Sequence, residues 1–383
     1  MTDATSTAPI AFIDLQAQRA RIDSELRARM DAVLAHGRYI LGPEVGELEE
    51  RLAAFAGVDN VVACANGTDA LVLAMRALGV QPGQAVLVPS FTFCATAEAV
   101  VLCGAVPVFI DVDAATFNID ADSFRTGVAH CVDNGHDLAG VIAVDLFGQP
   151  APYDELHEAA AGHGVWVIAD AAQSVGANVR GQRVGSLAPV TTASFFPAKP
   201  LGCYGDGGAV FATDPEIAAT MRSLCMHGQG ANQYDSVRIG YNSRLDTLQA
   251  AILLAKLDIF EDELQRRDAI ARRYSQMLAD VAGVPHVAAG VLSAWAQYTL
   301  TLEHGQRDRV IADLRGVGIP SAIYYPRPLH RQVAYESYPV AGGELPVSDD
   351  VSRRVLSLPM HPYLESAVQD RIAEQVRSSL QRG

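Results

Sequence analysis

Short runs of apolar residues alternate with helix-like patterns over residues 60–215. Seven of these runs are typical of strands: VVACA, AVLVPS, VPVFIDV, LAGVIAVDLF, VWVIADA, TTASFF and GGAVFATD. A strand that is apolar at nearly every position is buried on both faces, which is typical of a parallel sheet covered by helices. The pattern therefore predicts a large α/β sheet, and ligands of such sheets bind at the ends of the strands.

Helical periodicity precedes this region. Residues 16–56 predict two helices, because Gly37 and the Gly42-Pro43 pair interrupt the pattern between them. The interrupting loop, HGRYILGPE, carries an aromatic side chain and an arginine. We expect these helices to belong to the sheet domain.

The chain changes to a second pattern after the sheet. Residues 245–280 predict a long amphipathic helix, with or without a break, and the residues that follow predict a smaller α+β unit that includes the strand AQYTLTL. We therefore expect a large domain over residues 1–260 and a smaller C-terminal α+β domain over residues 261–383.

The composition is that of an ordinary globular protein of 383 residues, 49% hydrophobic and 19% charged. A formal net charge of −15 argues against nucleic-acid binding, which needs a basic surface, and an anionic substrate would need a local arginine cluster. The N-terminal segment lacks the basic flank and apolar core of a signal peptide, and no apolar run reaches the length of a membrane span. We expect a cytoplasmic protein that binds neither nucleic acid nor membranes.

The six cysteines are scattered along the chain, without a CxxC pair, and most fall inside apolar runs. Free cysteine in such runs behaves as a small hydrophobic residue. We expect neither a metal site nor a disulfide framework.

Lysine is nearly absent from this chain: two of the 29 basic residues are lysines, which leaves 27 arginines. Arginine replaces lysine at most solvated positions, but it cannot form a Schiff base, because only an amine can lose its proton and attack a carbonyl. Lys199 lies in the Gly- and aromatic-rich stretch SFFPAKPLGCYGDGGAVF and is the first candidate for a covalent cofactor anchor. Lys256, in the helical run AAILLAKLDIFEDEL, is interpreted as part of a solvated helix face.

If Lys199 holds pyridoxal phosphate, that cofactor also needs a carboxylate for its ring nitrogen and a partner for its phenolic oxygen. Asp170 ends the apolar run VWVIAD, where it can keep a pyridinium protonated, and Gln173 follows three residues later. The alternative for Asp170 is a helix N-cap, since aspartate is favoured where a strand leads into a helix.

The cofactor also needs a phosphate cradle and an aromatic plate. The segment Asn66-Gly67-Thr68-Asp69 lies between a strand and a helix, so the amides of Thr68 and Asp69 can bind phosphate at a helix N-terminus, and helix capping is the alternative. The Ser194 hydroxyl can add to the same cradle. Phe93, at another strand end, can stack on the ring, or it can be a core residue.

At this point the chain resembles the sugar-nucleotide aminotransferases of the DegT/DnrJ type, which are fold-type I pyridoxal phosphate enzymes. The resemblance covers nearly the whole length, through FIDLQAQ, GRYILGPEV, ANGTDAL, PSFTFCATAEA, GAVPVFIDVD, ADAAQSVGA, SFFPAKPLGCYGDGGAVFATD, YNSRLDTLQAAIL and YYPRPLH. Each of these segments alone is weak evidence for the resemblance. Together they are specific, because several widely separated segments in the right order are hard to obtain by chance. The resemblance implies a mainly parallel seven-stranded sheet and a smaller α+β C-terminal domain.

The resemblance also implies a role for each matching position. Lys199 would be bound covalently to the cofactor, Asp170 would pair with its ring nitrogen, and Gln173 would lie near its phenolic oxygen. Phe93 would stack on the ring. The phosphate would be held by Gly67, Thr68, Asp69 and Ser194, and by Asn242 of a neighbouring subunit. Arg244 would bind a substrate carboxylate across the same interface, so a homodimer with shared active sites is implied.

Within the family, the chain is similar to bacterial enzymes that aminate C3 of UDP-2-acetamido-2-deoxy-3-oxo-glucuronate with glutamate as donor, in the biosynthesis of surface polysaccharides such as O-antigen. The runs FFPAKPLGCYGDGG and SLPMHPYL carry this similarity. Many relatives have a histidine before the Tyr-Pro of the late turn, where this chain has Tyr324. The residues expected to contact substrate are Arg244, Tyr39, Tyr324, Tyr325, Arg327 and His330, and for Arg327 and His330 the alternative is a purely surface position.

Three other functions stay open. The first is a C4-specific transaminase of a 4-keto-6-deoxy sugar nucleotide, or a C3 transaminase of another 3-keto sugar nucleotide, either of which needs the same catalytic residues. The second is a sugar dehydratase of the same fold, which Lys199 disfavours because resembling deoxygenating enzymes carry histidine there. The third is a non-catalytic sensor or regulator, and the lack of a basic helix-turn-helix segment disfavours one that binds DNA.

Overall fold

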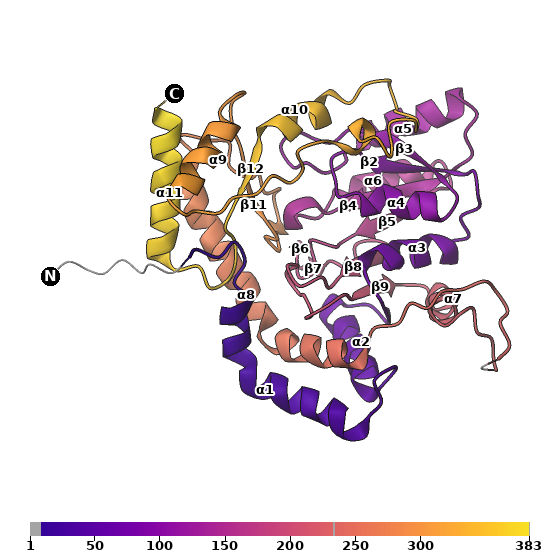
Figure 1. Cartoon of the computed structure of the whole chain (residues 1–383). Helices are drawn as coiled ribbons and strands as arrows, with labels where there is room; N and C mark the ends of the chain where they lie inside the picture. The colour runs from indigo at the N-terminus through magenta and orange to yellow at the C-terminus, as the bar shows by residue number, and fades with distance from the viewer. Residues whose placement is uncertain (1–8, 233, 383) are drawn as a thin grey trace.

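The structure is a computed structural model of the chain and describes residues 9–232 and 234–382 (Figure 1). Its core is one seven-stranded sheet, formed by β1 (Asn60–Cys64), β2 (Ala85–Pro89), β3 (Val106–Ile110), β4 (Leu138–Val144), β5 (Trp166–Asp170), β8 (Val190–Ser194) and β9 (Gly208–Ala212). The strand order is β1-β9-β8-β5-β4-β2-β3. β9 is antiparallel to β1 and β8, and the other pairs are parallel. The predicted mainly parallel sheet is confirmed, and its strands coincide with the seven apolar runs.

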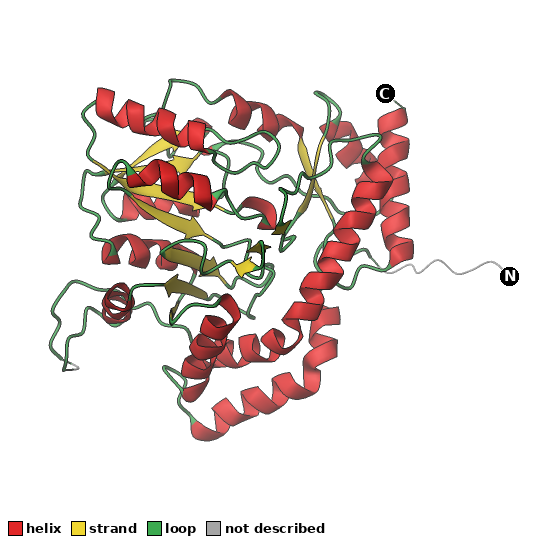
Figure 2. Cartoon of the chain, turned by 180° about the vertical axis from the view of Figure 1, so that it is seen from behind, coloured by secondary structure: helices red, strands yellow, loops and turns green. Residues whose placement is uncertain are grey.

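Helices cover both faces of this sheet (Figure 2). One face packs on α3 (Gly67–Ala77), α4 (Ala95–Leu102) and α7 (Pro215–Cys225). The other face packs on α2 (Pro43–Ala56), α5 (Ala121–Asp133), α6 (Tyr153–Ala161) and the first half of α8 (Thr247–Leu278). Side chains alternate along a strand, so Val86 and Val88 of β2 join the first layer and Leu87 joins the second. This double burial explains why the strands are apolar throughout.

The N-terminal helices pack along the start of α8 (Figure 1). α1 (Leu15–His36) ends at Gly37, which has a left-handed φ of 69° that glycine adopts at little cost. α2 begins at Pro43, which is compatible with the first turn of a helix. The predicted pair of helices and the loop between them are therefore confirmed.

A smaller α+β part follows. It contains the antiparallel pair β11 (Tyr298–Thr301) and β12 (Val355–Leu358), with α9 (Arg307–Gly316), α10 (Pro346–Arg354) and α11 (Ser366–Gln381). Short elements join the two parts: β6 (Asn178–Val179), β7 (Gln182–Arg183), β10 (Val291–Leu292), and the 3₁₀ turns Leu146–Gly148 and Leu329–Arg331. The two-residue strands are too short to leave a periodic signal in the sequence. The strand AQYTLTL, by contrast, was predictable and is β11.

The helix α8 connects the two parts and runs for 32 residues without interruption, although its ribbon bends part-way along (Figure 1). Its first half packs against the sheet and its second half packs in the core of the smaller part. The domain boundary predicted at residue 260 falls inside this helix. Among the described residues, no helix combines the length and apolar character needed to cross a membrane.

The interpretation of Lys256 as a solvated residue is wrong. Its side chain lies in α8 and the residue is 1% exposed, so it belongs to the core. Its ammonium donates to the Gly202 carbonyl oxygen and lies 4.2 Å from the centre of the Tyr204 ring. The acidic neighbours Glu261 and Asp262 face a different side of the helix, where they pair with arginines.

Candidate active site

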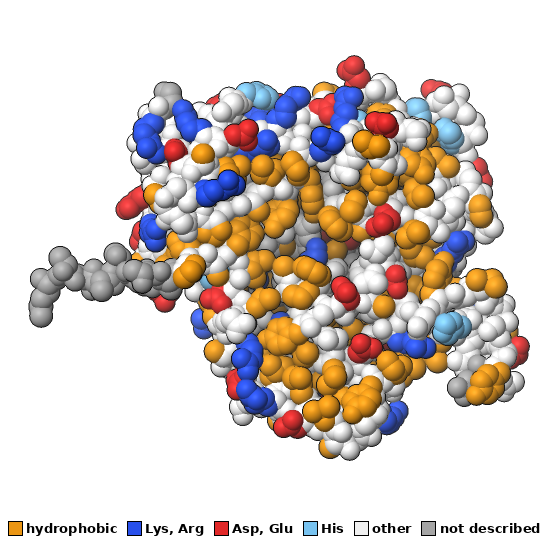
Figure 3. Space-filling view, in the orientation of Figure 1, with side chains coloured by type: hydrophobic (Ala, Val, Ile, Leu, Met, Phe, Trp, Pro, Cys, Tyr) orange, Lys and Arg blue, Asp and Glu red, His pale blue; other side chains and the backbone are white. Residues whose placement is uncertain are grey.

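A cavity of about 680 Å³ lies at the carboxyl ends of the parallel strands, between the sheet and the smaller part. The space-filling view shows a recess near the middle of this face, with many hydrophobic side chains around it (Figure 3). Its walls come from the segments after β1, β2, β4, β5 and β8, and from Ile13, Gln297, Tyr324 and Tyr325. The sheet therefore brings polar strand ends together in one enclosed place, as parallel topology dictates.

Lys199 and Asp170 line this cavity together. Burial lowers the pKa of the Lys199 amine, and the charge of Asp170 opposes that shift. A lowered pKa favours the neutral amine, which is the nucleophilic form. The arrangement suits a lysine that attacks a carbonyl.

Asp170 is 6% exposed and its carboxylate is held from two sides. Oδ2 accepts from the Thr96 hydroxyl at 3.1 Å, and Oδ1 accepts from the Ala172 amide at 3.2 Å. Burial raises the pKa of Asp170, while the Ala172 amide, Lys199 and the Thr96 hydroxyl favour the charged form. The carboxylate is thus fixed in orientation and faces the cavity, where a cationic partner would stabilise its charge.

The first turn of α3 faces the cavity through Gly67, Thr68 and Asp69. The Asn66 side chain caps the helix by accepting from the Asp69 amide at 2.8 Å, and the Asn66 carbonyl accepts from Ala70. The Asp69 amide, one of the two amides expected to bind phosphate, is therefore occupied by this cap. The amides of Thr68 and of Gly67 remain at the helix N-terminus, where backbone donors and the helix dipole favour an anion. Capping, one of the two alternatives for this segment, is present, and the phosphate cradle stays a prediction that the remaining amides allow.

Gly67 permits β8 to approach α3 closely. A Cβ on Gly67 would lie 2.7 Å from Ser194 Cβ, which no side chain tolerates without movement. Gly67→Ala is therefore expected to separate the cradle from Ser194 and to weaken pyridoxal phosphate binding by about tenfold, the effect of about 1.4 kcal/mol. Titration of the cofactor-free protein, followed by absorbance, measures this affinity.

Gly46→Ala is the matched control for that substitution. Gly46 also lies in a helix, but a Cβ there would meet nothing within 4 Å. We expect unchanged cofactor affinity in this variant. Equal weakening by both substitutions would contradict the role given to the close approach of Gly67.

The aromatic side of the cavity is built from Phe93 and Tyr325, whose ring centroids lie 6.2 Å apart. Phe93 is 52% exposed, so it is not the core residue that was its alternative. Gln173 is oriented by its Oε1, which accepts from the Phe147 amide at 2.8 Å. Its Nε2 lies 3.3 Å from the Tyr325 hydroxyl and is a donor at the cavity wall.

Five further candidate site residues do not line this cavity: Tyr39, Asn242, Arg244, Arg327 and His330. Tyr39 and Asn242 are exposed and Arg244 is half-buried, all close to the start of α8. Arg327 is exposed after the late turn. His330 is buried, with Nδ1 2.6 Å from the Ser90 hydroxyl oxygen, so in this chain it anchors the late turn to the end of β2. Tyr324 does line the cavity, packed against Phe12 with ring centroids 6.3 Å apart.

Several lining residues were not singled out from the sequence: Ile13, Thr96, Glu98, Asp206 and Gln297. Thr96 follows the end of β2 by seven residues, so its position beyond a strand end was a usable signal. Ile13 and Gln297 come from segments far away in the sequence, and only the tertiary fold places them in the wall of this cavity.

Charge is unevenly distributed over the cavity wall. Of the described lining residues, Lys199 is the single cation, whereas Asp69, Glu98, Asp170 and Asp206 supply carboxylates. A multiply charged anion would meet only Lys199 and the N-terminus of α3 in this chain. Additional positive charge for such a substrate must come from outside the walls described here. No cluster of histidine, cysteine, aspartate and glutamate suited to a metal ion occurs among the described residues.

Comparison of the sequence with models of protein families shows to which family the chain belongs. Residues 20–377 match the model of the DegT/DnrJ/EryC1/StrS aminotransferase family. The chain belongs to this family. It is an aminotransferase, as its resemblance implied, and several of its relatives are named as aminotransferases of nucleotide-linked sugars.

Individual relatives agree with that membership. The UDP-2-acetamido-2-deoxy-3-oxo-D-glucuronate aminotransferase of Pseudomonas aeruginosa is 47% identical, over 94% of this chain and 97% of that protein. The crystal structure of a DegT DnrJ EryC1 StrS aminotransferase from Brucella abortus has a TM-score of 0.95 and 52% identity, covering 97% of this chain and 99% of that one. NtdA from Bacillus subtilis, solved with bound PMP cofactor, has a TM-score of 0.89 and 26% identity, covering 99% of this chain and 87% of that one.

The residues of the cavity fit pyridoxal phosphate. The cofactor needs an amine, a carboxylate, a ring-stacking aromatic and an anion cradle, and Lys199, Asp170, Phe93 and the first turn of α3 line the same cavity. The close approach at Gly67 adds an independent geometric reason, since only a residue without a Cβ leaves Ser194 beside the cradle.

Proposed function

We propose that this aminotransferase transfers an amino group from glutamate to C3 of UDP-2-acetamido-2-deoxy-3-oxo-glucuronate. The observation that carries the choice of sugar is the 47% identity, over nearly the whole length, to the Pseudomonas aeruginosa enzyme named for that substrate. Other matched relatives are named as transaminases of dTDP sugars, so the choice of sugar needs a direct test. A role in the biosynthesis of surface polysaccharide such as O-antigen, in the cytoplasm, belongs to the same proposal.

In this proposal each residue of the cavity wall has its own role toward the cofactor and the substrate. Pyridoxal phosphate, when bound, supplies a carbonyl that joins to an amine and a ring that accepts the electron pair left after proton removal. Lys199 Nζ anchors it and then moves a proton to and from the donor Cα, for which its lowered pKa suits it. Asp170 holds negative charge at the ring nitrogen, Gln173 donates to the phenolic oxygen, and Ser194 with the first turn of α3 holds the phosphate.

A second subunit supplies the missing positive charge in this proposal. Asn242 and Arg244 flank Ser243, whose hydroxyl accepts at 3.2 Å from the amide of Ala65, the residue before Asn66 of the cavity wall. The neighbouring segment between α7 and Asn242 projects from the body of the protein and carries Tyr234 and Ile239, each 94% exposed (Figure 1). Exposed apolar side chains on a projecting segment are typical of an interface. A homodimer places Asn242 and Arg244 of each chain in the other chain's site.

The sugar is tested with a panel of keto-sugar nucleotides offered to protein first converted by glutamate. We expect UDP-2-acetamido-2-deoxy-3-oxo-glucuronate to be aminated at least about tenfold more efficiently, by kcat/KM, than its counterpart without the carboxylate or a dTDP-4-keto-6-deoxy sugar. The product's amino position is read by NMR. Preference for the 4-keto sugar would establish the C4 transaminase instead.

Two relatives are named as a regulatory and a sensory transduction protein, so a non-catalytic function is the candidate of another class. Glutamate distinguishes it from the enzyme. A catalytic protein converts bound pyridoxal phosphate to the amine form when glutamate alone is added, with a loss of visible absorbance. A sensor leaves that absorbance unchanged.

A further inference from the structure

The second lysine of the chain contacts the loop that carries the first. The loop from Phe195 to Gly205 leaves the sheet after β8, and Lys199 lies at its centre. Lys256 reaches this loop from α8 and donates to the Gly202 carbonyl oxygen at 2.5 Å. In a chain that otherwise uses arginine for its basic residues, both lysines are therefore associated with one loop.

The base of this loop is closed by its own hydrogen bonds. The Cys203 amide donates to the Phe195 carbonyl oxygen at 2.7 Å, and the Lys199 amide donates to the Phe196 carbonyl oxygen at 2.9 Å. Gly202 packs on the turn before Lys199, since a Cβ on Gly202 would lie 2.5 Å from the Phe196 carbonyl oxygen. A contact that holds Gly202 therefore also holds the turn from which Lys199 projects.

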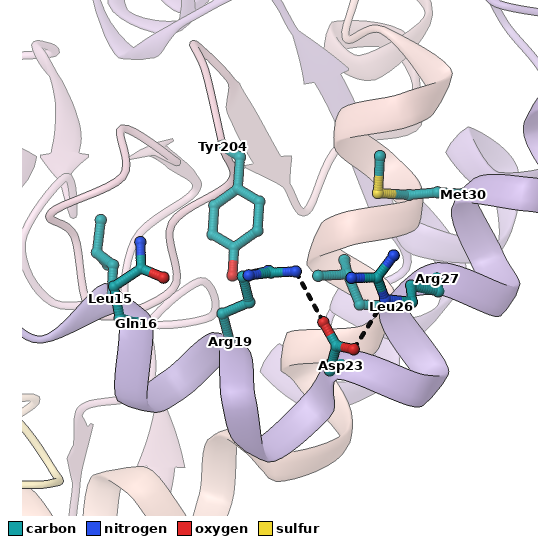
Figure 4. Close-up of a pocket in the computed structure, with 8 residues that line it drawn as sticks. All are labelled: Leu15, Gln16, Arg19, Asp23, Leu26, Arg27, Met30 and Tyr204. Carbon is teal, nitrogen blue, oxygen red and sulfur yellow. Dashed lines mark hydrogen bonds and ion pairs between the residues drawn. The ribbon is translucent and has the colours of Figure 1, made fainter.

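Tyr204 completes the environment of the Lys256 ammonium. Its ring centre lies 4.2 Å from Nζ, and its amide donates to Gln249 Oε1 of the same helix at 2.9 Å. Tyr204 also lines a surface groove of about 380 Å³ along α1, where its hydroxyl end lies beside Arg19 (Figure 4). The aromatic ring thus lies between the buried ammonium and this groove.

Packing alone does not account for a cation at this position. No salt bridge to Lys256 occurs among the described residues, and its only hydrogen bond there is to Gly202. Burial lowers the pKa of Lys256 to about 8, against the attraction of Glu263 and Cys203. An apolar side chain of similar length would avoid this desolvation cost.

We propose that Lys256 is a positioning residue for Lys199. By holding the Gly202 carbonyl against α8, it fixes the loop Phe195–Gly205 and with it the direction in which Lys199 enters the cavity. This inference rests on the proposed role of Lys199 as the cofactor lysine. Lys256 itself does not line the cavity and takes no part in the chemistry.

The test compares Lys256→Met with Arg267→Met. Arg267 is the matched control, because it is also a buried cation of α8 that donates to a backbone carbonyl, that of Trp295, away from the loop. In cofactor-free protein, we expect amides of residues 195–205 to exchange hydrogen about tenfold faster in Lys256→Met, the effect of losing one charge-assisted hydrogen bond. Arg267→Met is expected to lower the Tm without changing exchange in this loop.

The loaded protein gives the second measurement. Lys256→Met is expected to change the visible circular dichroism of bound pyridoxal phosphate and to slow its conversion by glutamate about tenfold, since a misplaced catalytic amine reacts slowly. Lys256→Gln, which keeps a donor, is expected to recover part of both signals. If Lys256→Met does not fold, Tyr204→Leu, which removes the ring beneath the ammonium, is expected to show the same changes.

Wild-type exchange in residues 195–205 and unchanged dichroism in these variants would overturn the inference, and so would equal effects of Arg267→Met. The exchange measurement uses protein without cofactor, so it is independent of the role of Lys199. A Lys199→Ala protein with unaltered cofactor absorbance would overturn that role and leave the exchange result standing.

Discussion

Replacing Lys199 by arginine is expected to abolish transamination, with a fall in turnover of at least about 10³-fold. Arginine keeps the positive charge near Asp170, but its guanidinium stays protonated and can neither join to the cofactor nor carry a proton to and from substrate. The substitution therefore separates the charge of Lys199 from its chemistry. Glutamate-dependent loss of visible absorbance measures the half-reaction directly, without need of the sugar substrate.

The small number of lysines gives this prediction a sharp control. Borohydride reduction of the loaded wild-type protein, followed by peptide mapping, must place the cofactor on Lys199 or Lys256, the two lysines of the chain. We expect all label on Lys199 and none on Lys199→Arg. Label on Lys256, or a Lys199→Arg protein that still responds to glutamate, would refute the assignment. The Tm of the variant shows whether it has folded.

The sheet was predictable because its strands are buried on both faces. Val86, Leu87 and Val88 are all apolar for this reason, although they contact different helix layers. Asp170 was recognisable because it ends such an apolar run, and Ser194 because it lies five residues before Lys199; parallel topology brings strand ends together. To predict these positions, the local sequence pattern and one rule of sheet topology were sufficient.

Lys256 was misread because its environment is not local. The sequence around it contains Glu261 and Asp262, which suggested a solvated face, but the loop after β8 covers the side of α8 on which Lys256 lies. Periodicity defines the faces of a helix and does not say what packs on each of them. Gln297 is a similar case, because its place in the cavity follows from how the smaller part docks on the sheet.

The positions of Tyr39, Asn242 and Arg244 reflect another limit. The resemblance gave Asn242 and Arg244 roles in a site shared by two subunits, and Tyr39 was expected to contact substrate; in one chain all three lie outside the cavity. Among the described residues that line the cavity, Lys199 is the single cation. An anionic substrate needs more positive charge than one chain offers there, and Arg244 of a second subunit would supply it. The structure of one chain therefore brings together the residues expected to bind the cofactor, but it leaves several of the residues expected to bind the substrate outside the cavity.

Asp170→Asn is expected to lower the rate of the glutamate half-reaction by about 10²- to 10³-fold, the range observed when one preorganised electrostatic contact to a transition state is removed. The amide has the same shape as the carboxylate, so Thr96 and the Ala172 amide still have a partner. What is lost is the negative charge that keeps the ring nitrogen protonated. Stopped-flow absorbance after addition of glutamate measures the rate.

Thr96→Val is the matched control, because it removes the hydroxyl that donates to Asp170 Oδ2 at 3.1 Å and leaves the charge in place. Loss of one such hydrogen bond is expected to slow the same step by about tenfold or less. An Asp170→Asn protein that reacts as fast as Thr96→Val would mean that the orientation of this side chain matters and its charge does not. Burial raises the pKa of Asp170, and a cationic ring beside it would join the Ala172 amide, Lys199 and the Thr96 hydroxyl in favouring the ionised form. We therefore expect two different pH profiles. As the pH is lowered, the affinity of the empty protein for the cofactor should fall first, and the activity of the loaded protein should fall only at a lower pH.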